Sequence, residues 1–293
     1  MKKGKPDFYG CKWTYNPEQD IYFNLASSPL AGCDDIVHHL DRLPRPDWEC
    51  YIADLEDCLN RQIRMAGDFC CIADRNTAGF TENSQRIRGY ESWFMDTVLD
   101  PEGVEALLEI IMEDKIKYWD AVIDWMIKTG NAGKIQVISE GDDLGAQDST
   151  ILAPDMLRAT VIPRMKRLFS HVKRRLPHVK VFLHSCGSIR PLIPDLIDAG
   201  VDILNPVQFT AKGMELEGLK KDFGKDLTFW GGGVDTQSTL NKDTPAQVHD
   251  EVKRIIDLMA LGGGFVFAPV HNVQEDVPPG NFWAMWDVLN EYR

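Results

Sequence analysis

The residues best suited to chemistry in this chain are His184 and Cys186, which stand two positions apart. The apolar residues 179–183 lead into them and predict a short buried strand. Because side chains alternate along a strand, these two are expected to project to the same side. A neutral imidazole and a thiolate are good zinc ligands, so the pair predicts a metal site. The alternative is a buried strand whose histidine and cysteine are only packed or hydrogen-bonded.

Polar or glycine-rich segments also follow the other predicted strands. In a (β/α)8 barrel the C-terminal ends of all strands meet at one rim, where the active site lies. An open doubly wound sheet gathers its site at one switch point instead, so functional residues after every strand favour the barrel. These segments are residues 74–76, 140–143, 184–188, 205–208, 231–235 and 271–272.

Strands and helices alternate along the chain, which is typical of an α/β protein with a parallel sheet. One helix is predicted to begin after Asp100, with Pro101 in its first turn, and to run to about Lys128. Another is opened by a capping box of Thr244 and Gln247. We recognise about six strand–helix units, whereas a complete barrel needs eight.

Residues 1–60 are aromatic and proline-rich, and they do not form a pattern of two further βα units. Either the first one or two units of the barrel are missing, or residues 1–60 replace them. Open strand edges in such a barrel must be covered. We expect a single domain over residues 1–293, covered by its N-terminal segment or, as a homodimer, by a second subunit.

Composition excludes some classes of partner and location. The net charge of -13 argues against nucleic acid and against an anionic membrane surface, because both attract basic proteins. No apolar run resembles a signal peptide or a membrane span. The seven cysteines are an odd number without the spacing of a disulfide framework, which indicates a reducing cytoplasm.

From about residue 68 to residue 293 the chain resembles the uroporphyrinogen decarboxylase (URO-D) superfamily. The resemblance rests on the sequence from His184 to Gly187, followed by residues 199–208, 232–237, 269–274 and 278–281. The family fold is a (β/α)8 TIM barrel. The family includes the decarboxylase of porphyrin biosynthesis and cobalamin-dependent methyltransferases, and the H-x-C-G sequence places this chain closest to the zinc methyltransferase branch.

In that branch, the resemblance implies that His184 and Cys186 hold zinc, which activates a bound thiol or alcohol as a nucleophile. A corrinoid (cobamide) carries the methyl group, supplied by a partner corrinoid protein or as free methylcobamide. Coenzyme M enzymes take a further cysteine from the last strand, but no cysteine follows Cys186 here. His271, after the last predicted strand, is the best substitute as a metal ligand, and a substrate contact is an equal alternative for it.

Carboxylates and amides at the same rim supply the other candidates. Glu140 or Asp143 is expected to be a proton donor or a fourth ligand, and Asp235 to bind substrate or orient a ligand histidine. The alternatives are a solvated turn for the first two and a turn cap for Asp235. The residues predicted to bind the small-molecule substrate are Asn205, Gln208, Gly232, Gly233 and Asn272.

Three functions remain open at this point. The first is a zinc-dependent methyltransferase that moves a methyl group between a corrinoid and a small thiol or a methoxylated or methylated substrate. The second is a metal-free carboxy-lyase of the uroporphyrinogen decarboxylase type. The third is a noncatalytic partner subunit that binds a corrinoid protein.

Overall fold

The structure, a computed structural model, describes residues 5–16 and 23–292. It divides into two compact units, formed by residues 1–138 with 159–179 and by residues 139–158 with 180–293. Strand β4 (Ile135–Gly141) and helix α5 (Pro154–Arg175) each continue from one unit into the other. The single domain expected over residues 1–293 stays a prediction. No helix in the described ranges is long and apolar enough to cross a membrane.

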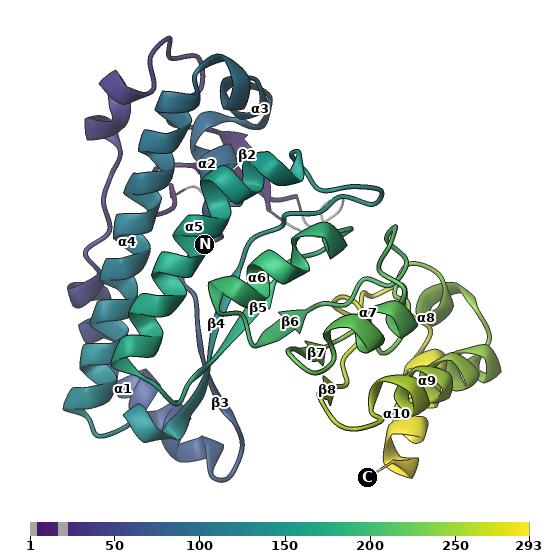
Figure 1. Cartoon of the computed structure of the whole chain (residues 1–293). Helices are drawn as coiled ribbons and strands as arrows, with labels where there is room; N and C mark the ends of the chain where they lie inside the picture. Colours follow the sequence, from purple (N-terminus) through teal and green to yellow (C-terminus); the bar gives the residue numbers. More distant parts are fainter. Residues whose placement is uncertain (1–4, 17–22, 293) are drawn as a thin grey trace. The chain divides into compact units, whose positions relative to one another are not determined.

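The first unit is organised around the long helix α4 (Pro101–Lys128), which contacts α1, α2 and α3 (Figure 1). α4 begins as the sequence predicts, because the Asp100 side chain accepts a hydrogen bond from the backbone of Gly103. Its apolar side chains Leu107 and Ile111 are fully buried. The other elements of this unit are β1 (Lys12–Thr14), β2 (Asn24–Ser27), η1 (Val37–Arg42), α1 (Trp48–Ala66), β3 (Cys71–Asp74), α2 (Phe80–Arg88), α3 (Tyr90–Leu99) and η2 (Ala132–Lys134).

The main sheet has six strands in the order β3-β4-β5-β6-β7-β8, and the pairs from β5 to β8 are parallel. Residues 5–16 and 23–60 add no strand to it, because β1 and β2 pair only with each other. The part of the chain that the structure describes therefore has the predicted α/β fold with six parallel-sheet strands, against eight in a complete barrel. The remaining strands are β5 (Lys180–His184), β6 (Ile203–Asn205), β7 (Thr228–Trp230) and β8 (Phe265–Val266).

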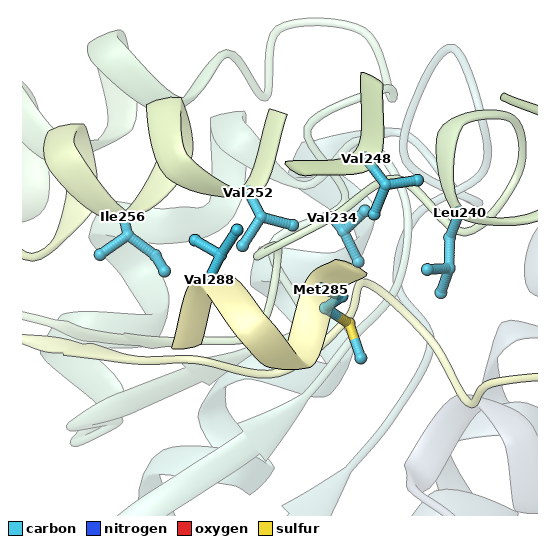
Figure 2. Close-up of a cluster of buried hydrophobic side chains, with 7 residues drawn as sticks. All are labelled: Val234, Leu240, Val248, Val252, Ile256, Met285 and Val288. Carbon is cyan, nitrogen blue, oxygen red and sulfur yellow. The ribbon is translucent and has the colours of Figure 1, made fainter. Parts of the chain in front are cut away.

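A small hydrophobic core anchors the C-terminal part of the second unit. Helices α9 (Pro245–Met259) and α10 (Pro279–Glu291) pack together (Figure 1), and the capping box of Thr244 and Gln247 opens α9 as predicted. Figure 2 shows Val234 of the loop after β7 among the side chains of α9 and α10, so this core holds the loop in place. The other helices of the unit are η3 (Arg190–Leu192), α6 (Ile193–Ala199), α7 (Leu216–Phe223) and α8 (Thr239–Lys242).

The buried Cys11 gives a test of the packing in the first unit. Its thiol donates a hydrogen bond to the carbonyl of Arg86 at 3.3 Å, and burial raises the pKa of the Cys11 thiol to about 12. Only a thiolate reacts with an alkylating reagent, so Cys11 is expected to stay unlabelled in the native protein at about pH 8, where the exposed Cys50 is labelled. Peptide mapping by mass spectrometry measures both residues. Equal labelling of the two in the folded protein would contradict this packing, and labelling of both in denaturant is the control.

Candidate metal centre

Three side chains that can bind a metal come together after strands β4 and β5. His184 is the last residue of β5, Cys186 follows it, and Asp143 lies in the loop after β4. Their candidate ligand atoms all lie within 4.8 Å of one another. The Sγ atom of Cys186 lies 3.5 Å from Nε2 of His184, and Oδ1 of Asp143 lies 3.8 Å from the same nitrogen. The expectation that His184 and Cys186 project to the same side is confirmed.

A hydrogen bond from the neighbouring strand decides which nitrogen of His184 is available. The parallel register places Asn205, at the end of β6, opposite His184. The Asn205 side-chain Nδ2 donates to the carbonyl of Trp230 at 2.8 Å, so its Oδ1 is the atom that lies 2.7 Å from His184 Nδ1. Because Oδ1 can only accept, Nδ1 carries the proton. The lone pair of Nε2 is then directed at Cys186 and Asp143, as a metal ligand requires.

Hydrogen bonds tie the loop after β4 to the loop after β5. The backbone N–H of Cys186 donates to Oδ1 of Asp143 at 2.9 Å, and the N–H of Asp142 donates to the carbonyl of His184 at 2.8 Å. The N–H of Leu144 donates to Oγ of the fully buried Ser185 at 3.1 Å. Asp143 and Cys186 therefore hold a fixed spacing although they come from different βα loops.

Two glycines allow these loops to approach so closely. A Cβ atom on Gly187 would lie 2.5 Å from the backbone carbon of Gly145, and a Cβ on Gly145 would lie 2.6 Å from the carbonyl oxygen of Cys186. Gly187 also has a φ of +85°, a conformation that other residues rarely adopt. Side chains larger than hydrogen at either position would separate Asp143 from Cys186.

Amide side chains extend this framework to further loops. Gln208 accepts a hydrogen bond from the N–H of Gly187 at 2.8 Å through Oε1, and its Nε2 donates to Oε1 of Gln147 at 3.0 Å. Gln147 in turn donates to the carbonyl of Thr210 at 3.2 Å. Gln208, predicted to bind substrate, thus supports the Cys186 loop. The sequence prediction did not include Gln147 or Gly145, whose only signal was their place in the loop after a strand.

The donor set fits zinc in type and in spacing. Imidazole nitrogen, thiolate sulfur and carboxylate oxygen are all zinc ligands, and ligand atoms about 2.0–2.3 Å from a tetrahedral ion lie about 3.3–3.8 Å from one another. The two spacings to Nε2 of His184, 3.5 and 3.8 Å, fall in this range, and the third pair of ligand atoms lies within 4.8 Å. The side chains of His184 and Asp143 are 27% and 44% exposed, so the group is open to solvent. Three protein ligands with an accessible fourth position are typical of a catalytic zinc site.

The structure places the other predicted carboxylates outside this group. Glu140 is buried within β4 at 3% exposure and is not free of interaction partners. Asp235, 6% exposed, accepts hydrogen bonds from the N–H of Gln237 and the hydroxyl of Ser238. Asp235 therefore has the geometry of the turn cap that was its alternative, and its role towards substrate or ligand stays a prediction.

The remaining candidates are buried glycines and exposed loop residues. A Cβ atom on Gly232 would lie 2.6 Å from the carbonyl oxygen of Val207, and one on Gly233 would lie 2.3 Å from the Phe267 ring. Close packing against Val207 and Phe267 is thus sufficient to explain why both positions hold glycine. His271 and Asn272 are exposed, and His271 lies outside the group of ligand atoms found among the described residues. Their predicted roles in metal and substrate binding remain predictions.

The fold and the site define an α/β protein with a metal-capable group at the C-terminal ends of parallel strands. The chain belongs to the uroporphyrinogen decarboxylase (URO-D) family, whose sequence profile matches residues 57–292. It is also similar to the solved structure of a methyltransferase from Methanosarcina mazei, with a TM-score of 0.69 and 18% sequence identity. That match covers 97% of this chain and 76% of the methyltransferase. No curated protein matches the sequence.

The close contact between Gly145 and Gly187 predicts that a methyl group added at Gly187 destabilises the protein. Gly187→Ala is expected to lower the free energy of unfolding by about 2 kcal/mol or more, because it adds a steric clash to an unfavourable φ. Gly133→Ala is the matched control, since its Cβ would meet nothing within 4 Å. Urea denaturation measures both variants. A Gly187→Ala midpoint equal to that of Gly133→Ala would contradict the close approach of the loops.

Proposed function

We propose that this chain is a zinc-dependent methyltransferase that moves a methyl group between a corrinoid and a small thiol or a methoxylated or methylated substrate. The observation that carries the proposal is the convergence of Asp143, His184 and Cys186, with the ring of His184 held so that Nε2 faces the group. Membership of the URO-D family and the likeness to a structure named as a methyltransferase support the same class of activity.

In this proposal Nε2 of His184, Sγ of Cys186 and a carboxylate oxygen of Asp143 hold the metal. Zinc, when bound, supplies a Lewis acid that lowers the pKa of a thiol or alcohol and keeps it as a nucleophile at neutral pH. Asn205 keeps the proton of His184 on Nδ1, and Asp143 adds a negative charge that favours a cation. The solvent-exposed side of the group is where a substrate thiol or hydroxyl would enter.

Asp143 rather than His271 completes the ligand set that we propose. Asp143 is already fixed by the N–H of Cys186, whereas His271 lies outside the group in the described residues. Asp143 was expected to be a proton donor or a fourth ligand, and we now propose it as the third ligand, beside His184 and Cys186. The corrinoid would approach as free methylcobamide or on a partner protein.

Metal content of the purified protein is the first test. We expect about one zinc ion per chain, and loss of that zinc in Cys186→Ala and His184→Ala, because each variant removes one of three ligands. Cys50→Ala, which changes an exposed cysteine of the first unit, is the control and should keep its zinc. Elemental analysis after dialysis gives the stoichiometry. Metal-free wild-type protein that also fails to bind added zinc would exclude the proposal.

The hydrogen bond to the imidazole gives a second, more specific test. Asn205→Leu removes the acceptor for Nδ1 of His184 and is expected to weaken zinc binding about 10–100-fold. Asn205→Asp keeps an oxygen acceptor and should bind zinc much more tightly than the leucine variant. Competition with a chromophoric chelator measures the affinities, and circular dichroism checks that both variants are folded. Equal affinities of Asn205→Leu and wild type would refute the role assigned to Asn205.

Turnover separates the proposal from its two alternatives. Methylcobalamin with 2-mercaptoethanol is a suitable probe, because loss of the methylcobalamin absorbance reports methyl transfer directly. Zinc-loaded protein that transfers methyl groups, with no transfer by Cys186→Ala, supports the methyltransferase. Metal-free protein that decarboxylates a porphyrinogen would support the second function. Zinc binding without turnover on any methyl donor would support the third function, a noncatalytic partner subunit.

One observation argues against the decarboxylase function. Binding of a substrate with several carboxylates calls for accessible basic side chains near the site. Arg190, the arginine closest along the sequence to the Cys186 loop, is held by Asp222 and by the carbonyl of Gly213 and lies over the Phe223 ring. It serves the packing of α7 instead.

A further inference from the structure

The face of the sheet that carries His184 also carries two aromatic rings. Phe182 precedes His184 by two positions on β5, so both side chains project to the same face. Asn205 of β6 lies opposite His184, and the register of β6 with β7 places Trp230 next to Asn205. Trp230 therefore projects to this face as well. All these residues belong to the second unit.

The two rings meet over β6. Their centres lie 5.4 Å apart and their planes cross at 84°, which is an edge-to-face contact. Because β6 lies between β5 and β7 in the sheet, rings that touch must lie over it, at the level of Ile203 and Asn205. Asn205 is the residue that orients the imidazole of His184. The ring pair is thus a direct neighbour of the side chain that holds the candidate metal ligand.

The two faces of these strands differ in their exposure. Val181, Leu183 and Phe229 project to the opposite face and are fully buried. Phe182 and Trp230 stay partly exposed, although the interior of a complete barrel is a packed core of side chains. A molecule bound at the metal centre can therefore contact the two rings, which already hold each other in a fixed orientation.

The side chains around the rings are uncharged. Ile203 and Thr228 lie opposite Phe182 and next to each other, and Val266 of β8 lies opposite Trp230. Lys180 stands at the other end of β5, four positions before His184, where its Nζ lies 3.6 Å from Asp202. The surface beside the metal centre therefore suits an apolar group and offers no partner to an anionic one.

We propose that Phe182 and Trp230 form the subsite for an apolar, ring-sized group of the substrate and so determine specificity at the metal centre. The inference rests on the proposed function, because the metal holds the sulfur or oxygen atom of the same molecule. Contact with the rings removes apolar surface from water and adds favourable ring contacts. Both terms are lost for a substrate that has only a short polar substituent.

Two thiols that differ in this group provide the test. Cobalt(II) replaces zinc in the full chain, because zinc itself has no d–d absorption, and a thiolate bound to cobalt gives a charge-transfer band. Titration of this band measures the affinities of benzyl mercaptan and 2-mercaptoethanol. We expect benzyl mercaptan to bind at least about tenfold more tightly, because only its ring can be buried in the subsite.

Substitution of each ring locates the subsite. Phe182→Leu and Trp230→Leu keep an apolar side chain but remove the ring, so each should lower the ratio of the two affinities about threefold or more. The ratio is the readout, so a general weakening of the site does not imitate the effect. Trp283→Leu is the matched control, because Trp283 meets Phe282 edge to face on α10 and is 57% exposed. It should keep the ratio of the wild type.

The outcomes separate this inference from the proposed function. Protein that binds neither zinc nor cobalt would contradict the proposed function, and the inference falls with it. Cobalt-loaded wild-type protein that binds both thiols equally would contradict the inference alone. A preference that is unaltered in both ring variants would also overturn it. The comparison of the thiols uses wild-type protein, so it remains decisive if a ring variant does not fold.

Discussion

The metal-capable site depends on one line of hydrogen bonds across three neighbouring strands. His184, Asn205 and Trp230 are the last residues of β5, β6 and β7, and each hydrogen bond joins one strand end to the next. The carbonyl of Trp230 orients the amide of Asn205, and the amide fixes the proton of His184. A change of register in the sheet would separate these partners. The chemistry of the imidazole is therefore set by the parallel pairing of the strands.

A second constraint acts on the loops beyond the strands. Asp143 and Cys186 come from different loops, so their spacing is not set by strand geometry. It is set by backbone hydrogen bonds and by the contact of Gly145 with Gly187, which only glycines permit. Gln208 and Gln147 then link these loops to the one after β6. The site is thus built from loops that are joined to one another by hydrogen bonds and close packing.

The metal centre and a cavity of about 900 Å³ in the first unit have different relations to the family. The group of Asp143, His184 and Cys186 lies inside the matched residues 57–292, on the part of the fold shared with the other members. The cavity of the first unit takes Phe8, Trp13 and Tyr51 from before that match. One side of that cavity is formed by residues 5–9, Trp13 and Tyr51, from the part of the chain that the sequence pattern could not assign to βα units. This part of the chain adds no strand to the main sheet in the ranges that the structure describes.

The features that depend on near neighbours in the chain could be predicted from the amino-acid sequence. These are the strand before His184, the caps at Asp100 and Thr244, the α/β class, and the proximity of His184 and Cys186, because a period of two residues or one turn of helix is a local property. Three further features required the folded structure: Asp143 joins this pair, Asn205 sets the tautomer of His184, and Gly232 and Gly233 pack against Val207 and Phe267. These contacts join residues about 20–40 positions apart or more, and their partners follow from strand register and loop path, which no local pattern encodes.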